Sequence, residues 1–195
     1  MRAWRPEDAG DLASSADDER VLAWMSDVWP EHYTLEDARW WIEEGQFSSG
    51  MAWALCLEDR PKGGVGLHPQ RGFLRCNVEL GWWLNPAYWG NGIVPEAGSH
   101  LLRAAWALAD CARVFAPIHA GNVRSERAAE KMGMTLESVQ RLSAFKRGRL
   151  IDRHIYVKLN PALQPSLAGT PAASGRLFAA TSEPMSPSDP ALTDL

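Results

Sequence analysis

The chain has few cysteines, no long apolar run and little net charge. Its three cysteines, Cys56, Cys76 and Cys111, are odd in number and widely spaced, which argues against a disulfide framework and a cysteine metal site. We expect them to be buried thiols in a reducing compartment. No apolar run is long enough to span a bilayer, and the first ten residues lack the apolar core of a signal peptide. These absences predict a cytoplasmic protein that does not associate with membranes.

The formal net charge is only −4, so the chain lacks the bulk positive charge typical of nucleic-acid-binding surfaces. His, Cys, Asp and Glu residues form no group with metal-ligand spacing, so we expect no metal. The 195 residues and the hydrophobic fraction of 46% are sufficient for one packed domain, which we place at residues 1–160. Residues 161–195 are rich in Pro, Ser and Ala and lack apolar periodicity, which predicts a disordered tail.

The spacing of apolar residues predicts an alternation of helices and strands. Strands are expected at 1–4, 51–57, 64–68, 74–84, 112–118, 136–145 and 150–159, and helices from Pro6, at 17–25, at 34–44, from Gly92 to about 109, and from Asn122 to Gly133. A turn at residues 59–63 joins the second and third strands, and one at Arg147-Gly148 joins the last two. The fold class is therefore α+β, with a mixed, mainly antiparallel central sheet flanked by helices.

The most informative segment is the turn that contains Gly90 and Gly92, between the fourth strand and the helix that follows. Glycine permits backbone angles that a side chain forbids, and it lets a ligand approach main-chain N–H groups. A helix N-terminus also presents free N–H groups and the positive end of its dipole, which favour a phosphate or pyrophosphate. The alternative is an ordinary tight turn. Pro95 stands where a dinucleotide-binding fingerprint requires its third glycine, and the Gly-Lys-Ser/Thr of a phosphate loop is absent.

Several motifs in this order resemble the GNAT superfamily of N-acetyltransferases. They are residues 88–94, Tyr-Trp-Gly-Asn-Gly-Ile-Val, at the exit of the fourth strand, and residues 122–125, Asn-Val-Arg-Ser, at the start of the next helix. Four segments resemble the Rim-type branch, which includes enzymes that acetylate ribosomal-protein N-termini. They are residues 5–9, Arg-Pro-Glu-Asp-Ala, residues 33–38, Tyr-Thr-Leu-Glu-Asp-Ala, residues 79–82, Glu-Leu-Gly-Trp, and residues 92–97, Gly-Ile-Val-Pro-Glu-Ala. The resemblance covers residues 2–159.

The resemblance implies a sheet whose fourth and fifth strands splay apart, and acetyl-CoA as co-substrate. The family's loop pattern, Arg/Gln-x-x-Gly-x-Gly/Ala, falls on Trp89 to Val94. Trp89 departs from its first position, Val94 is bulkier than its last, and Pro95 removes one N–H donor. The pantetheine arm is expected to pair with the main chain of the fourth strand, as an added strand would. The implied contacts to acetyl-CoA are Trp83, Leu84, Trp89, Gly90, Asn91, Gly92, Ile93, Val94 and Asn122.

Acetyl transfer to an amine requires a base for the amine and an acid for the departing thiolate. Glu79 is the best candidate base, and the alternatives are a substrate-binding carboxylate or a solvated charge. Ser125 is the best candidate acid, because Rim-type enzymes are similar in placing a serine here and residues 136–145 contain no tyrosine. The alternative for Ser125 is helix capping together with Asn122. His119, at the end of the fifth strand, is more often structural in such a position.

These residues predict an N-acetyltransferase that moves an acetyl group directly from acetyl-CoA to a primary amine, on a protein N-terminus or a small molecule. The alternative from another class is a non-catalytic acyl-CoA-binding or sensing domain. A monomer and a homodimer both stay open. The ten tryptophans are expected mainly in the core, with Trp29, Trp82, Trp83 and Trp89 as candidates for lining a cleft.

Overall fold

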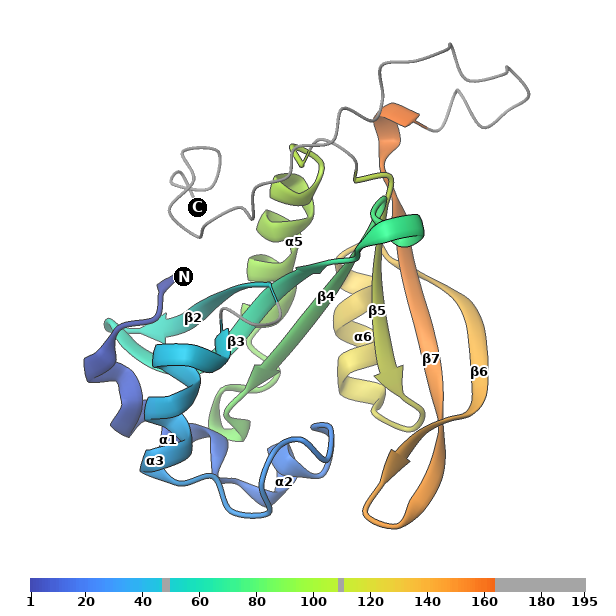
Figure 1. Ribbon diagram of the computed structural model, residues 1–195. Coiled ribbons are helices and arrows are strands. Elements are labelled where there is room, and N and C mark those ends of the chain that lie inside the picture. The colour runs from blue at the N-terminus through green and yellow to red at the C-terminus, as the bar shows by residue number, and fades with distance from the viewer. Residues whose placement is uncertain (47–49, 109–110, 164–195) are drawn as a thin grey trace.

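The computed structural model describes residues 1–46, 50–108 and 111–163. One seven-stranded sheet forms its centre, with helices on both faces (Figure 1). The strands are β1 (Arg2–Ala3), β2 (Met51–Leu57), β3 (Arg60–Pro69), β4 (Asn77–Leu84), β5 (Arg113–His119), β6 (Thr135–Lys146) and β7 (Arg149–Leu159). The helices are α1 (Ala9–Ala16), α2 (Glu19–Leu22), α3 (Leu35–Trp40), α5 (Ile93–Ala105) and α6 (Val123–Lys131). The α+β class is confirmed.

The strand order is β1-β2-β3-β4-β5-β7-β6, and all neighbours are antiparallel except β4 and β5. Alternate residues of the strands pack on two cores. Val78, Leu80 and Leu84 of β4 join the core beneath α5, whereas Trp83 packs against the core of α1 and α3 on the opposite face. The side-chain alternation of a strand therefore assigns Glu79 and Gly81 to the face of Trp83.

The parallel pairing of β4 with β5 is short. It joins residues 77–79 to residues 113–115 and ends at the pair Glu79–Phe115. Beyond this pair the two strands diverge, as Figure 1 shows. The predicted splay of the fourth and fifth strands is confirmed, and it begins immediately after Glu79.

Several predicted boundaries were wrong for local reasons. Glu58 and Asp59 both have positive φ angles, of 48° and 60°, and form a two-residue turn, so β3 resumes at Arg60 rather than Gly64. Pro61 is tolerated there because the pairing of β2 with β3 shifts between Leu55 and Cys56. β4 begins at Asn77 because residues 72–74 form a 3-10 turn.

The helices differ at their ends too. Asp18 caps α2 by accepting the N–H of Arg20 at 2.9 Å, so the helix predicted at 17–25 spans only Glu19–Leu22. α5 ends at Ala105. The capping box of α3 is present, with Asp37 accepting the N–H of Thr34 at 2.8 Å and Thr34 accepting that of Asp37 at 3.2 Å. The predicted tail, residues 161–195, lies outside the described residues from residue 164 onward.

Candidate active site

A cavity of about 600 Å³ opens where β4 and β5 diverge. Its walls are β4, the turn into α5, the end of β5, the first two turns of α6, and the segment around α2. The residues that line it include Arg20, Trp24, Met25, Glu79, Trp82, Trp83, Leu84, Trp89, Gly90, Gly92, Ile93, Val94, Pro95, Pro117, His119, Asn122, Arg124, Ser125, Arg127, Ala128, Lys131 and Arg153. A volume of this size is typical of pockets for small molecules and cofactors. It brings together the predicted residues other than Asn91, which is not among those that line it.

The turn into α5 presents main-chain N–H groups to this cavity. Gly90 and Gly92 have φ angles of 86° and 79°, and a Cβ added at either would meet no atom within 4 Å. Positive φ, rather than crowding, therefore explains these two glycines. Gly92 is the N-cap of α5, and its carbonyl accepts the first helical hydrogen bond, from Glu96. Within the described residues, no N–H of residues 91–94 donates to a protein acceptor. The turn thus has the open space and the free donors that a pyrophosphate requires.

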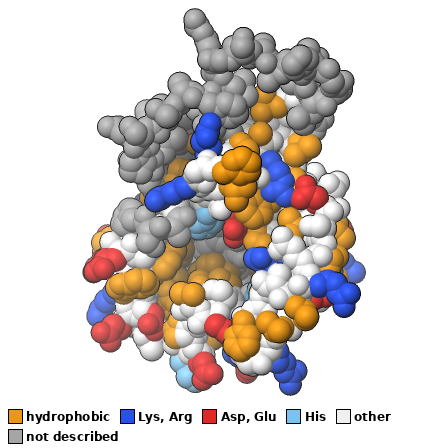
Figure 2. All heavy atoms as spheres, turned by 45° about the vertical axis from the view of Figure 1, so that its right-hand side comes forward, with side chains coloured by type: hydrophobic (Ala, Val, Ile, Leu, Met, Phe, Trp, Pro, Cys, Tyr) orange, Lys and Arg blue, Asp and Glu red, His pale blue; other side chains and the backbone are white. Residues whose placement is uncertain are grey.

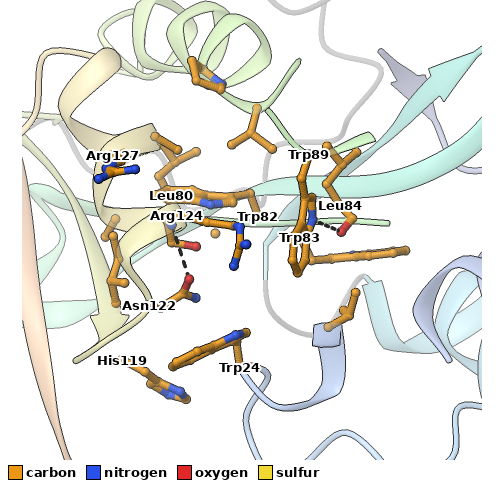
Figure 3. A pocket seen from close by; sticks show the side chains of 18 of the residues that line it. Trp24, Leu80, Trp82, Trp83, Leu84, Trp89, His119, Asn122, Arg124 and Arg127 are labelled. Atoms are coloured by element: carbon orange, nitrogen blue, oxygen red, sulfur yellow. Dashed lines mark hydrogen bonds between the residues drawn. The ribbon is translucent and has the colours of Figure 1, made fainter. Parts of the chain in front are cut away.

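Trp89 fixes this turn to the neighbouring elements. Its indole Nε1 donates to the carbonyl of Leu84 at 2.7 Å, at the end of β4. The guanidinium of Arg124, on α6, lies over the Trp89 ring, with its Cζ 4.9 Å from the ring centroid. Figure 3 shows both contacts at the cavity. Trp89 therefore holds β4, the glycine turn and α6 in a fixed relation, and its N–H is used within the protein.

Glu79 lies at the vertex of the splay. It is the last β4 residue paired with β5, and it is opposite His68 of β3. It lines the cavity from the sheet face that carries Trp83. A carboxylate here can accept a hydrogen bond or a proton from an amine that enters the cavity on this face.

Ser125 and Asn122 have separate roles at the start of α6. The side-chain oxygen of Asn122 accepts the N–H of Ser125 at 3.3 Å, which makes Asn122 the N-cap. The cap therefore involves the main-chain N–H of Ser125, and the Ser125 hydroxyl takes no part in the capping hydrogen bond. Ser125 also lines the cavity. The sequence left two roles open for Ser125, proton donor or helix cap, and the side chain that caps α6 is that of Asn122.

His119 and Trp24 both line the cavity, and Figure 3 shows the two rings side by side. Trp24 also lines a neighbouring pocket together with Trp89, Gly90 and Arg124. Burial lowers the pKa of His119, and the nearby cations Lys146 and Arg153 lower it further, although Asp27 opposes them. Trp24, from the segment after α2, is 38% exposed and was missed by the sequence analysis. Of the four tryptophans considered there, Trp29 packs against Trp83 and Tyr33 instead, with centroids 5.8 and 4.8 Å away.

The rest of the described chain offers little competing chemistry. No group of three or more His, Cys, Asp or Glu residues within it could hold a metal ion, and none of its helices is long and apolar enough to cross a membrane. All three cysteines are free thiols, but only Cys111 is buried. The expectation of buried thiols was therefore wrong for Cys56 and Cys76, which are half-buried. On the face drawn in Figure 2, basic side chains are interspersed with acidic and hydrophobic ones.

Comparison with known proteins agrees with this geometry. A family model described as "Acetyltransferase (GNAT) domain" matches residues 1–135. The chain belongs to the GNAT acetyltransferase family. This GNAT chain is also similar to an uncharacterized N-acetyltransferase, YoaA, of Bacillus subtilis (strain 168), with 26% identity over 118 residues. That match covers 60% of this chain and 66%, just under two thirds, of the relative's own length.

Solved structures share the GNAT fold at lower identity. The microcin C7 self-immunity acetyltransferase MccE, solved with acetyl-CoA and AMP, superposes with a TM-score of 0.71 at 20% identity. The match covers 81% of this chain and 90% of that one. RimJ of Mycobacterium smegmatis, solved with CoA disulfide, gives a TM-score of 0.72 at 16% identity and covers 83% of this chain and 82% of that one. At these identities the likeness shows the fold alone.

Proposed function

We propose that this GNAT chain transfers an acetyl group from acetyl-CoA directly to a primary amine. The observation that carries the proposal is the cavity at the splay, because it is lined both by the start of α5, with its free N–H groups, and by Glu79 and Ser125. An anion-binding turn alone would support binding. A carboxylate and a hydroxyl on the same cavity add the two proton-transfer groups that acyl transfer requires.

The donor would be held by the chain's own main-chain groups. The N–H groups of residues 90–94 bind the pyrophosphate, and the edge of β4 beyond Glu79, which β5 leaves unpaired, binds the amide-bearing pantetheine arm. Acetyl-CoA supplies an activated thioester. The N–H groups near Leu84 are then available to stabilise the oxyanion that forms when the amine attacks.

Two side chains would move protons. Glu79 takes a proton from the ammonium group, directly or through water, and the neutral amine then forms the C–N bond at the thioester carbonyl. Ser125 gives its proton to the sulfur as the C–S bond breaks, and the second proton of the nitrogen restores the Ser125 hydroxyl. The products are the acetylated amine and CoA thiol, with one proton left on Glu79. The imidazole of His119, whose pKa is lowered by burial and nearby cations, also lines the cavity, and in its neutral form it could accept a hydrogen bond from the amine.

The acceptor is proposed at the level of a primary amine, either a protein N-terminus or a small molecule. Among the structures that share the fold are a ribosomal-protein-S5-alanine acetyltransferase of Vibrio fischeri and the microcin C7 self-immunity acetyltransferase MccE, so the fold by itself does not select one kind of acceptor. The Rim-type branch stays a prediction from residues 5–9, 33–38, 79–82 and 92–97.

The test is an amine panel that follows the release of CoA thiol from acetyl-CoA. The panel contains small primary amines and peptides with Ala or Ser N-termini, and N-acetylated versions of the same peptides serve as controls. We expect thiol release with at least one free amine and none with its blocked form. Binding of acetyl-CoA by calorimetry without turnover on any amine would instead support the alternative, a non-catalytic acyl-CoA-binding domain.

A further inference from the structure

One basic side chain of the cavity lies on the sheet face opposite α6. β7 directs His154 toward α6, where its Nδ1 lies 2.9 Å from Glu126 Oε1. Side-chain alternation therefore places Arg153 on the other face of the sheet, which is the face that carries Glu79. Arg153 lines the cavity, and on the neighbouring strand β5 it is paired with His119.

A bulge in β6 holds the guanidinium of Arg153. The pairing of β6 with β7 shifts between Gln140 and Ala144, which are opposite Arg153 and Ile151. Nε of Arg153 donates to Ser143 Oγ at 3.2 Å, and Nη2 donates to Gln140 Oε1 at 2.9 Å. The Ser143 hydroxyl in turn donates to the main-chain carbonyl of Gln140 at 2.9 Å, so its lone pairs are left for the guanidinium. Both partners are neutral, so they fix the orientation of Arg153 without cancelling its charge.

The acidic neighbour of Arg153 in the sequence is engaged elsewhere. Leu142, inside the bulge, has a positive φ angle of 49°, a conformation that costs energy for a residue with a side chain, and its N–H donates to the Asp152 carboxylate at 2.7 Å. Within the described residues, Arg153 forms no ion pair, whereas Arg20 of the same cavity is paired with Asp18 at 2.6 Å. Bulges often re-aim a side chain next to an active site. An oriented cation without a counterion favours an anionic ligand group.

The positions of the two charged groups on this face set the spacing between their ligands. Glu79 is opposite Phe115, and His119 lies four residues further along β5, which corresponds to about 13 Å of strand. Arg153 is directly opposite His119. The two long side chains bridge part of this distance. A ligand that reaches both must carry its two charges several bonds apart, farther than the amine and carboxylate of an α-amino acid.

We propose that Arg153 binds a carboxylate of the acceptor, several bonds away from the amine that is acetylated. The inference rests on the proposed function for the position of the amine near Glu79, and it adds the chemical class of the acceptor. Among the described residues that line the cavity, Glu79 is the only acidic one. An ammonium group at Glu79 and a carboxylate at Arg153 therefore match the charges of this face. An acidic side chain near a peptide N-terminus and the far carboxylate of a small amino acid share this chemistry.

Calorimetry on the full chain saturated with CoA tests the proposal with two matched pairs of ligands. One pair is ε-aminohexanoate and ε-aminohexanamide, and the other is the C-terminally amidated peptides Ala-Glu-Ala and Ala-Gln-Ala, so each pair differs in one negative charge. The proteins are the unaltered chain, Arg153→Gln, Arg153→Lys and the control Arg149→Gln. Arg149 is an exposed cation on the same strand that does not line the cavity.

We expect the unaltered chain to bind the acid of at least one pair about ten- to a hundred-fold more tightly than its amide, the range for hydrogen bonds to a charged group. The pair that shows this ratio identifies the source of the carboxylate. In Arg153→Gln the ratio should fall to within about threefold, through loss of affinity for the acid alone, and unchanged affinity for the amide shows that the variant is folded. Arg153→Lys keeps the charge without the planar fork and should retain part of the ratio. The control should retain all of it.

Equal binding of acid and amide in both pairs would overturn the inference, and so would failure to bind any of the four ligands. A preference for the acid that Arg153→Gln leaves unchanged would remove the assignment to Arg153, as would equal loss of both ligands in the two Arg153 variants. Thiol release with the same amines separates this inference from the transfer reaction. Selective binding of the acid without turnover removes only the reaction, whereas equal kcat/KM for acid and amide keeps the reaction and overturns the carboxylate site.

Discussion

Replacing Ser125 and Asn122 one at a time separates catalysis from helix capping. The side-chain oxygen of Asn122 accepts an N–H at 3.3 Å, which is long for a hydrogen bond of this type. Loss of a cap costs about 0.5–2 kcal/mol, so we expect Asn122→Ala to lower the free energy of unfolding by an amount in the lower half of that range, about 0.5–1 kcal/mol. Ser125→Ala leaves the cap in place, and its effect should stay within about 0.5 kcal/mol.

The kinetic effects should rank in the opposite order. Ser125→Ala removes the proposed proton donor to the sulfur and should lower kcat about ten- to a thousand-fold, which corresponds to about 1.4–4 kcal/mol of transition-state stabilisation. Its affinity for acetyl-CoA should change little, because the hydroxyl is needed only as charge develops on the thiolate. Ser125→Thr keeps a hydroxyl and should retain more activity than the alanine variant.

The assay measures CoA thiol release, with an amine identified in the panel, and thermal unfolding on the same preparations. A Ser125→Ala variant that is destabilised but has normal kcat would refute the assignment. Ser125 would then be structural, and solvent would be the remaining proton source for the thiolate.

Three further predictions concern other parts of the cavity. Gly92→Asp should abolish acetyl-CoA binding in a folded domain, because a carboxylate would stand where the pyrophosphate is expected; unchanged affinity by calorimetry would contradict this. Glu79→Gln should lower turnover most at low pH, where more of the amine needs a base, whereas an equal loss at every pH would indicate a substrate contact. Burial and nearby cations lower the pKa of His119 below its ordinary 6.5, so the unfolded chain takes up a proton more readily and stability should fall as pH drops through about 6.5. His119→Gln should weaken that dependence of the melting temperature on pH, and identical slopes for the two proteins would count against it.

The fold was predictable where short-range signals decide the structure. The capping box at Thr34 and the stop of α6 at Gly133 are encoded within a few residues, and the strand-turn-helix unit around Gly92 needs only positive φ angles and a helix start. The boundaries that failed depend on finer choices. The turn at Glu58-Asp59 requires positive φ angles at two consecutive residues that are not glycine. The pattern of apolar residues does not indicate the position of this turn.

In the candidate site, the residues proposed to bind acetyl-CoA were easier to predict from the sequence than those around Trp24 and His119. Gly90 to Val94 are contiguous, and Asn122 and Ser125 lie within one helical turn, so their grouping follows from local structure. Trp24 is different, because nothing near it in the sequence points to a cleft. It reaches His119 only when the segment after α2 lies across the end of β5.

One tertiary contact explains why the acceptor side depends on distant parts of the chain. Asp27, after α2, accepts the main-chain N–H of Arg147 at 2.9 Å and contacts Nζ of Lys146 at 3.1 Å, and these two groups lower the pKa of its carboxyl. The contact ties the tip of the β6–β7 hairpin to the segment that supplies Trp24. It also holds Lys146, which together with burial and Arg153 lowers the pKa of His119. Changes in either segment can therefore alter the wall of the cavity around Trp24 and His119 without changing the glycine turn and the start of α6, where we propose that acetyl-CoA binds.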